Sequence, residues 1–162
     1  MAQINKPTDY FRTKLYAGNS TASRAITFDE TGNMQPDWVW IKETDGAINH
    51  YGFDAVAGAT KSLSQNTDST ESTRDSTWFN SFDTNGFTVG TEDNINDTGD
   101  NYAAWCWRAG TTSGLSGGTI TPSSYSINTT SGFGIYRYTG TGSAGTIAHG
   151  LGKVPAMIMV TP

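Results

Sequence analysis

The sequence predicts an all-β protein with the architecture of an antiparallel, jelly-roll-like β-sandwich. Charged residues make up only 15% of the 162 residues, whereas aromatic residues make up 12% and glycine occurs 19 times. Few charges, many aromatic and hydroxyl side chains and frequent glycines are typical of short strands joined by tight turns. No segments with a helical period alternate with the apolar segments, as an α/β fold would require.

Apolar and β-branched residues recur in short segments between turn-forming residues, and each such segment predicts a strand. Asn85-Gly86 predicts a tight hairpin, because both residues accept a positive φ. A short helix is the alternative for Phe53–Leu63, although Gly58 disfavours it. The expected strands are Phe11–Tyr16, Trp38–Lys42, Phe79–Phe82, Phe87–Val89, Tyr102–Arg108, Thr119–Thr121, Gly132–Tyr138, Gly145–Ala148 and Met157–Val160.

Tryptophans occur two residues apart in two of the expected strands. Trp38 and Trp40 share one face of their strand, and Trp105 and Trp107 share one face of another. Val39 makes the opposite face of the first strand apolar as well. Because a strand that is apolar on both faces is typical of a position between two layers, we expect the paired tryptophans to belong to the core.

A segment near the start of the chain is echoed about 120 residues later. The matching segments are Leu15–Ser20 with Tyr136–Thr141, Ala25–Thr27 with Gly145–Ile147, and Pro36–Ile41 with Pro155–Val160. The sequence therefore predicts an N-terminal arm at 1–9, a β-sandwich module at 10–110, a Gly/Ser/Thr-rich linker at 111–131 and a final segment at 132–162. The final segment is either the start of a second copy or the closing strands of the first module.

The charge pattern disfavours two classes of partner. The formal net charge is −5 and the basic residues are scattered singly, so no basic cluster is available to neutralise nucleic-acid phosphates. No basic amphipathic segment or long apolar run indicates membrane insertion. The polar segment Met1–Pro7 lacks the apolar run of a signal peptide. An extracellular-type composition without an export signal is expected of virion proteins, which leave the cell by lysis.

Five segments together carry a family resemblance, namely Phe11–Asn19, Gln35–Lys42, Asn49-His50 with Phe53–Val56, Ser81–Gly90 and Tyr102–Gly110. In this order and spacing they resemble a module common in marine bacteriophage structural proteins, often in tandem copies and similar to concanavalin A-like (laminin G-type) jelly rolls. The resemblance covers about residues 10–110, with the second copy beginning near Gly132. One departure is Ala57, where the family usually carries an arginine, so any ion pair of that arginine is absent here.

The resemblance implies a virion component in a tail fibre, another appendage or a capsid decoration. It implies a homo-oligomer that contacts other virion proteins, and it supplies no catalytic residues. Glu43 and Asp45 begin the Glu-x-Asp-x-x-Glu pattern of jelly-roll glucanases, but Ile48 occupies the third acidic position. We therefore expect no hydrolase site at this pair.

Nucleophilic catalysis is not expected either. Neither His50 nor His149 lies next to Cys106 or within a Gly-x-Ser-x-Gly elbow. Cys106 has no surrounding cysteines or histidines for zinc, so we expect a buried, inert thiol. His149 lies in a glycine-rich loop, where bonding to the backbone is expected.

Candidate ligand-binding residues are Trp78, His50 and Tyr51. Trp78 occurs in a polar segment, so it is expected to be exposed and able to stack on a sugar ring. Asp93, Asp97 and Asp100 are candidate ligands for weakly bound calcium, which takes six to eight oxygens. Their spacing does not fit the twelve-residue calcium loop, and a solvated turn rich in Asx motifs is the alternative. No other cofactor is expected.

These observations predict a non-enzymatic bacteriophage virion structural protein. It would be displayed on the particle surface and act through contacts between subunits and with partner proteins. The alternative is a carbohydrate-binding module that recognises host-surface glycans.

Overall fold

The structure is a computed structural model that describes residues 4–162, so the first three residues of the expected N-terminal arm lie outside it. It is an all-β, antiparallel sandwich, which confirms the predicted fold class. Two single-turn helices accompany the strands, η1 (Pro7–Asp9) and α1 (Asp93–Asn96). The strands are β1 (Phe11–Ala17), β2 (Arg24–Thr27), β3 (Trp38–Glu43), β4 (Tyr51–Asp54), β5 (Lys61–Ser64), β6 (Ser72–Thr73), β7 (Phe79–Asp83), β8 (Gly86–Val89), β9 (Asn101–Trp107), β10 (Ser124–Asn128) and β11 (Phe133–Arg137).

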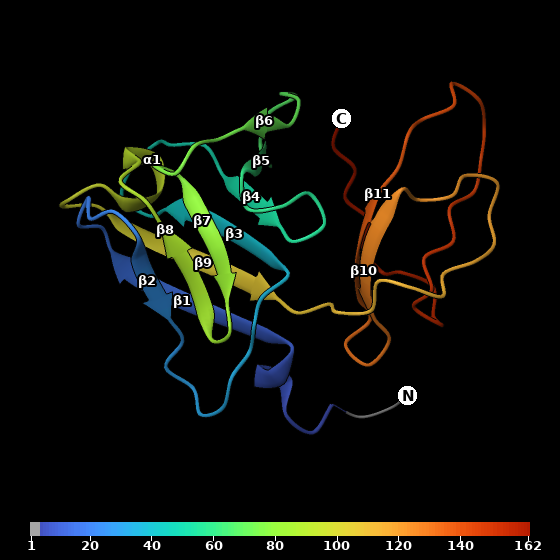
Figure 1. Ribbon diagram of the computed structural model, residues 1–162, viewed down its shortest axis with the longest axis horizontal. Coiled ribbons are helices and arrows are strands. Elements are labelled where there is room, and N and C mark those ends of the chain that lie inside the picture. The colour runs from blue at the N-terminus through green and yellow to red at the C-terminus, as the bar shows by residue number, and fades with distance from the viewer. Residues whose placement is uncertain (1–3) are drawn as a thin grey trace.

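Two sheets of unequal size face each other (Figure 1). The six-stranded sheet has the order β1-β9-β3-β4-β5-β6, and the three-stranded sheet has the order β2-β8-β7. Side chains alternate between the two faces of a strand. In β3, Val39, Ile41 and Glu43 are buried on one side, whereas Trp38 and Trp40 are partly exposed on the other. The core therefore lies on one face of the six-stranded sheet only.

Aromatic rings join the two sheets inside the sandwich. Phe53 of β4 stacks on Phe79 of β7 with ring centroids 4.7 Å apart, and Phe79 stacks on Phe87 of β8 at 5.7 Å. Cys106 of β9 is fully buried in the same core, as expected from the sequence. Burial raises the pKa of the Cys106 thiol, so the thiol stays protonated.

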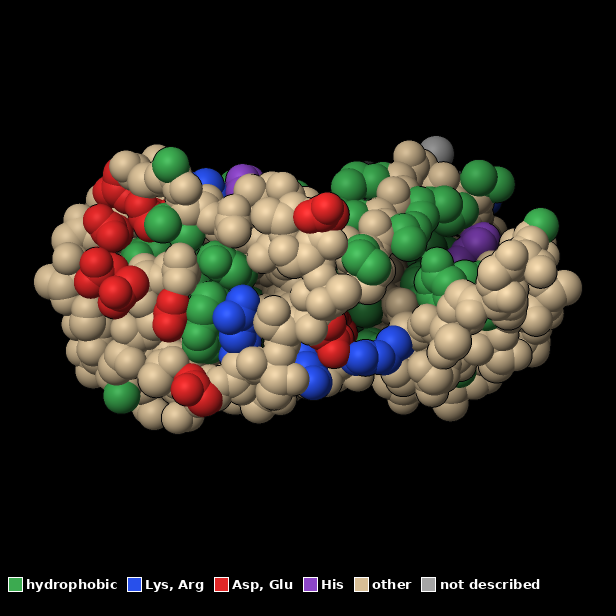
Figure 2. All heavy atoms as spheres, turned by 90° about the horizontal axis from the view of Figure 1, so that it is seen from above, with side chains coloured by type: hydrophobic (Ala, Val, Ile, Leu, Met, Phe, Trp, Pro, Cys, Tyr) green, Lys and Arg blue, Asp and Glu red, His purple; other side chains and the backbone are tan. Residues whose placement is uncertain are grey.

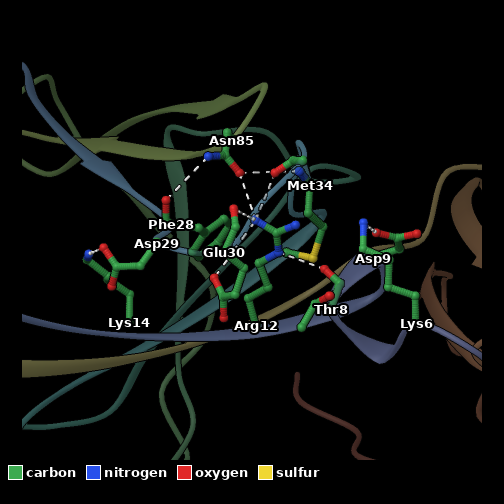
Figure 3. Close-up of polar contacts among 11 residues, drawn as sticks. Lys6, Thr8, Asp9, Arg12, Lys14, Phe28, Asp29, Glu30, Met34 and Asn85 are labelled. Atoms are coloured by element: carbon green, nitrogen blue, oxygen red, sulfur yellow. Dashed lines mark hydrogen bonds and ion pairs between the residues drawn. The ribbon is translucent and has the colours of Figure 1, made fainter.

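A buried arginine ties the edge of the six-stranded sheet to the opposite sheet (Figure 3). Arg12 of β1 is 1% exposed, and its guanidinium lies 5.5 Å from the centre of the Phe28 ring. Its Nε donates to the Thr8 carbonyl at 2.6 Å, and its Nη1 donates to the Gly32 carbonyl at 3.2 Å. Nη1 also donates to Oδ1 of Asn85, in the turn between β7 and β8, at 3.0 Å. One side chain thus joins β1, the loop before β3 and the β7–β8 hairpin.

The predicted β7–β8 hairpin is confirmed, but its turn is shifted by one residue. Thr84 and Asn85 form the turn, and Gly86 begins β8 with a φ of 135°. A Cβ atom at Gly86 would lie 2.0 Å from the carbonyl oxygen of Ile26 in β2. Glycine is therefore required by its φ and by the close approach of the neighbouring strand. The Asn85 side chain instead serves as the acceptor for Arg12.

The alternative of a helix at Phe53–Leu63 is wrong. The segment contains the end of β4, a turn and the start of β5. The Asp54 carboxylate accepts hydrogen bonds from the backbone N–H groups of Val56 and Ala57, at 2.9 and 2.7 Å, which closes an Asx turn. Gly58 then adopts a φ of 99°, which a helix does not use.

The C-terminal part differs most from the expected pattern. β10 lies inside the predicted linker, and its partner is β11, the strand expected at 132–138. Only isolated bridges form in two expected strands, where Ile147 pairs with Gly118 and Ile120. Met157–Val160 forms no strand, because the described residues offer it no neighbouring strand.

The β10–β11 ladder packs beside the sandwich (Figure 1). The Gly110 N–H donates to Oγ of Ser126 at 2.8 Å, just after β9. Arg137 of β11 forms a bidentate ion pair with Glu71, with N–O distances of 2.9 and 2.8 Å. These contacts fix the ladder against two different parts of the module.

Replacing Arg12 by methionine should lower the free energy of unfolding by on the order of 3 kcal/mol, because the buried acceptors around it lose their donor. Lys14→Met is the matched control on the same strand. Lys14 pairs with Asp29, whose side chain is 84% exposed, and such surface pairs contribute about 0–1 kcal/mol. Urea denaturation of both variants measures the difference. Equal losses in the two variants would contradict a central role for Arg12.

Candidate functional site

The outer face of the six-stranded sheet carries two rows of side chains set by strand register. In the first row Phe11 of β1 lies opposite Trp107 of β9, which lies opposite Trp38 of β3. In the second row Thr13 lies opposite Trp105, which lies opposite Trp40. We call the surface formed by Phe11, Trp38, Trp40, Trp105 and Trp107 the aromatic face.

The prediction that the paired tryptophans belong to the core is therefore wrong. All four are partly exposed, whereas the alternate residues of β3, Val39 and Ile41, are fully buried. The physical reason is that the three-stranded sheet covers only one face of the larger sheet. Both faces of β3 are apolar, but only one of them has a partner layer.

The rings of the aromatic face contact one another closely. Phe11 and Trp107 have ring centroids 4.9 Å apart, and Trp40 and Trp105 have centroids 6.0 Å apart. Phe133 of β11 packs on Trp107 with a centroid distance of 6.0 Å, and on Trp38 at 6.2 Å. The C-terminal ladder thus packs on the first row, whereas the tryptophans of the second row remain partly exposed.

His50 lies at the edge of the second row. Its Nδ1 accepts a hydrogen bond from the Trp40 indole N–H at 3.2 Å, with the two ring centroids 5.7 Å apart. This bond needs an unprotonated Nδ1. Burial, and then the nearby charge of Lys42, lower the pKa of His50 and so favour the neutral ring that accepts the bond. Of the three predicted ligand-binding residues, His50 alone faces this surface.

The prediction that Trp78 is exposed is wrong. Trp78 is 8% exposed and packs edge-to-face on Tyr51, with centroids 5.0 Å apart. The guanidinium of Arg74 lies 3.9 Å from the centroid of the Trp78 ring. The polar residues before Trp78 form a turn in which the Thr77 N–H donates to Asp75 at 2.9 Å. Trp78 and Tyr51 are therefore core residues, and they do not join His50 in one exposed site.

Acidic side chains gather at the end of the molecule that carries α1 (Figure 2). Glu43, Asp45 and Asp100 bring one carboxylate oxygen each to within 4.8 Å of one another. Glu43 is 6% exposed, and burial, followed by the charge of Asp100, raises the pKa of its carboxyl group. The pKa of Asp45 is lowered by hydrogen bonds from the backbone and side-chain amides of Asn101.

Two of the predicted calcium ligands have other contacts. The backbone carbonyl of Asp93 accepts a hydrogen bond from the Tyr102 hydroxyl at 2.6 Å. The Asp97 carboxylate accepts one from Ser20 at 3.3 Å. Of the three predicted calcium ligands, Asp100 is the one that belongs to the acidic group, whose other members are Glu43 and Asp45. The sequence does not indicate this group, because the pairing of β3 with β9 brings its members together.

A buried asparagine fixes the loop before β9. Asn96 is fully buried; its Oδ1 accepts from Arg24 at 2.7 Å, and its Nδ2 donates to the carbonyls of Thr21 and Gly90. The amide side chain of Asn96 thus holds the loop that contains the predicted calcium ligands. His149, as expected, bonds to loop backbone, because its Nδ1 accepts from the Leu151 N–H at 3.1 Å.

Exposed apolar side chains occur in the C-terminal segment as well as on the aromatic face. Val154 is 92% exposed, Met157 73%, Ile158 76% and Val160 68%. Figure 2 shows hydrophobic side chains gathered on the part of the molecule that carries β10 and β11. Among residues 4–162 no helix has the length and hydropathy needed to cross a membrane.

His50 should titrate with a midpoint below its ordinary value of 6.5, since its folded-state pKa is lowered. The unfolded chain then takes up the proton first, so stability falls as the pH drops through this range and protonation releases Trp40. NMR of the imidazole protons measures the midpoint, and tryptophan fluorescence should change with it. The fluorescence change should be absent in His50→Phe. A midpoint above 6.5 would contradict the described bond.

No curated protein and no solved structure matches the chain. One family model does match, over residues 6–162, and it is described as a domain of unknown function (DUF7483). The matched range includes the sandwich, the β10–β11 ladder and the C-terminal apolar segment. The chain therefore belongs to the DUF7483 family.

Proposed function

We propose that this chain is a non-enzymatic bacteriophage virion structural protein that acts through contacts made by its aromatic face. The main observation that supports this proposal is the set of partly exposed tryptophans on the outer face of the six-stranded sheet. The proposal has the chain on the particle surface, in a tail fibre, another appendage or a capsid decoration. The ordered segments that resemble marine bacteriophage modules supply this part of the proposal.

The composition of the aromatic face supports protein contact. Tryptophan and other aromatic residues are enriched in the cores of protein interfaces, where a few of them carry most of the binding free energy. Leu15, 74% exposed, extends the apolar surface along β1. Leu15 of β1 lies opposite Ala103 of β9, which lies opposite Lys42 of β3. The charge of Lys42 therefore lies at the rim of the aromatic face. An apolar centre with a polar rim is the usual anatomy of an interface.

The position of the face supports contact between extended surfaces. It is formed by β1, β9 and β3, three neighbouring strands of one sheet, so the backbone that carries its side chains is held by ladder hydrogen bonds. A surface that is rigid before binding loses little conformational entropy in a complex. Sister subunits are the partners that this proposal names first, because exposed apolar surface of this kind marks association sites.

Thr13→Asp should weaken self-association by about tenfold or more, because it places a charge beside Trp105 in the second row. Sedimentation equilibrium over a range of protein concentrations measures the association constant. Thr27→Asp is the matched control, since Thr27 is an exposed threonine on β2 of the opposite sheet. The control should associate like the wild type.

A wild-type chain that stays monomeric at every concentration would contradict the subunit contact. Equal weakening by the two substitutions would place the contact elsewhere. Detection of the chain in purified phage particles, with an antibody raised against it, tests the virion part separately. Its absence from the particles would contradict that part.

Glycan recognition is the second candidate function, and the second row favours it. Trp40 and Trp105 lie next to each other and are flanked by the polar groups of His50 and Thr13. Sugars stack their apolar faces on indole rings, while neighbouring polar groups fix their orientation. This candidate replaces the sugar site expected at Trp78, which lies in the core.

A glycan array probed with the labelled full chain should then give saturable binding, and Trp105→Ala should weaken it by about tenfold or more. Thr27→Asp should bind like the wild type. An array without saturable binding would exclude this candidate and would leave the protein-contact proposal intact.

A further inference from the structure

We propose that two copies of this chain exchange their β10–β11 ladders, so that each ladder packs on the first row of the other copy's aromatic face. The backbone would rotate at Gly110 when the ladder leaves its own sandwich. Each copy then gives and receives the same element, which is the usual form of a domain-swapped dimer. The proposal rests on the subunit contact proposed above, and it names the segment that makes this contact.

The ladder depends on a covering surface. It has two strands, and an isolated two-stranded hairpin is marginally stable at best in water. Phe133 of β11 stacks on Trp107 and meets Trp38 edge to face, with centroids 6.0 and 6.2 Å away. The first row therefore supplies the layer on which β11 packs. A second copy presents the same first row, because strand pairing sets its register.

The chain passes from the sandwich to the ladder at a single residue. Ala109 is held by the sandwich, because its N–H donates to the Asp37 carboxylate at 2.7 Å. Thr111 already belongs to the ladder, because it exchanges two backbone hydrogen bonds of 2.9 Å with Ile127 of β10. Gly110 lies between these two anchored residues. A change in the backbone angles of Gly110 is therefore enough to redirect the whole ladder.

The conformation of Gly110 directs the ladder onto its own sandwich. Its φ is 128°, a value that glycine adopts readily and other residues avoid. A Cβ atom at this position would have no heavy atom within 4 Å, so neighbouring groups do not require glycine there. The requirement for glycine thus lies in the backbone angle alone. Rotation to a negative φ would turn the ladder away from its own first row.

The contact between ladder and sandwich also carries opposite charges. Arg137 of β11 forms a bidentate ion pair with Glu71, directly before β6, with N–O distances of 2.9 and 2.8 Å. Paired hydrogen bonds of this kind add geometric specificity to the attraction. A ladder that arrives from a second copy finds the same carboxylate at the same distance from the first row. The ring contacts and the ion pair can therefore form between two copies as they form within one.

Uncovered apolar surface favours association over docking within one chain. Val154, Met157 and Ile158 are largely exposed, and Figure 2 shows hydrophobic side chains gathered on the part of the molecule that carries the ladder. Docking within one chain leaves this surface in water, whereas a dimer can bury it. A tethered ladder competes with an effective concentration on the order of millimolar. We therefore expect exchange to increase as the protein concentration rises.

A mixture of two charge-reversed variants tests the exchange. Arg137→Glu and Glu71→Arg each place like charges across the contact, so each variant alone should associate weakly. In an exchanged heterodimer both contacts regain opposite charges, because each ladder meets the sandwich of the other variant. Native mass spectrometry resolves the two chains by mass. It should show the heterodimer about tenfold or more above either homodimer.

Gly110→Ala tests the proposed rotation. Alanine disfavours the positive φ that docking within one chain requires, so the association constant should rise about tenfold in sedimentation equilibrium. Gly99→Ala is the matched control at the α1 end of the molecule. Gly99 has a φ of 105°, and a Cβ atom there would also have no heavy atom within 4 Å. The control should associate like the wild type.

The outcomes separate the exchange from the subunit contact on which it rests. A wild type that associates, together with a mixture that forms heterodimers only in the statistical share, would overturn the exchange and leave the subunit contact. Absence of association in both the wild type and the mixture would overturn both proposals. Equal association of Gly110→Ala and Gly99→Ala would overturn the rotation at Gly110. The mixture retains Gly110, so it tests the exchange even where the alanine variant does not fold.

Discussion

The buried guanidinium of Arg12 is the interaction on which the arrangement of the two sheets depends. A charged group that is 1% exposed needs hydrogen-bond acceptors, and here acceptors from three separate segments pair with Nε and Nη1, whereas Nη2 has no partner among the described residues. The Asn85 acceptor lies in the β7–β8 turn, so the smaller sheet is held over one end of the larger one. At the other end of the sandwich the Tyr16 hydroxyl donates to the Ile95 carbonyl at 2.8 Å, and Asn96 bridges the neighbouring loops while it accepts a hydrogen bond from Arg24.

The unequal size of the sheets then decides what the molecule presents to solvent. A six-stranded sheet that is covered on one face by a three-stranded sheet keeps its other face free. The tryptophans of the second row of the aromatic face are partly exposed, whereas the C-terminal ladder packs on the first row through Phe133. At the α1 end, the pairing of β3 with β9 gathers carboxylates instead of aromatic rings. The aromatic face and the acidic group thus both result from the order and pairing of strands in the six-stranded sheet.

The internal echo shows how strongly a strand depends on its neighbours. Pro36–Ile41 and Pro155–Val160 match in sequence, but β3 lies between β9 and β4, whereas Met157–Val160 forms no strand. Val39 is fully buried, whereas Ile158, at the matching position, is 76% exposed. Local propensity is similar in the two segments. The difference is the presence of partner strands, which supply the ladder hydrogen bonds and the covering layer.

The sequence by itself determined the all-β class, most strands of the module and the β7–β8 hairpin, since these depend on residues close together in the chain. The burial of Cys106 was expected as well, but it depends on which face of β9 is covered. It also indicated His50 and Asp100, although with other partners. Only the tertiary structure decided which apolar face of β3 is covered, that Trp78 turns inward and that Glu43 meets Asp100. Period-2 alternation tells which side chains share a face, but the choice of the buried face follows from contacts between strands far apart in the chain.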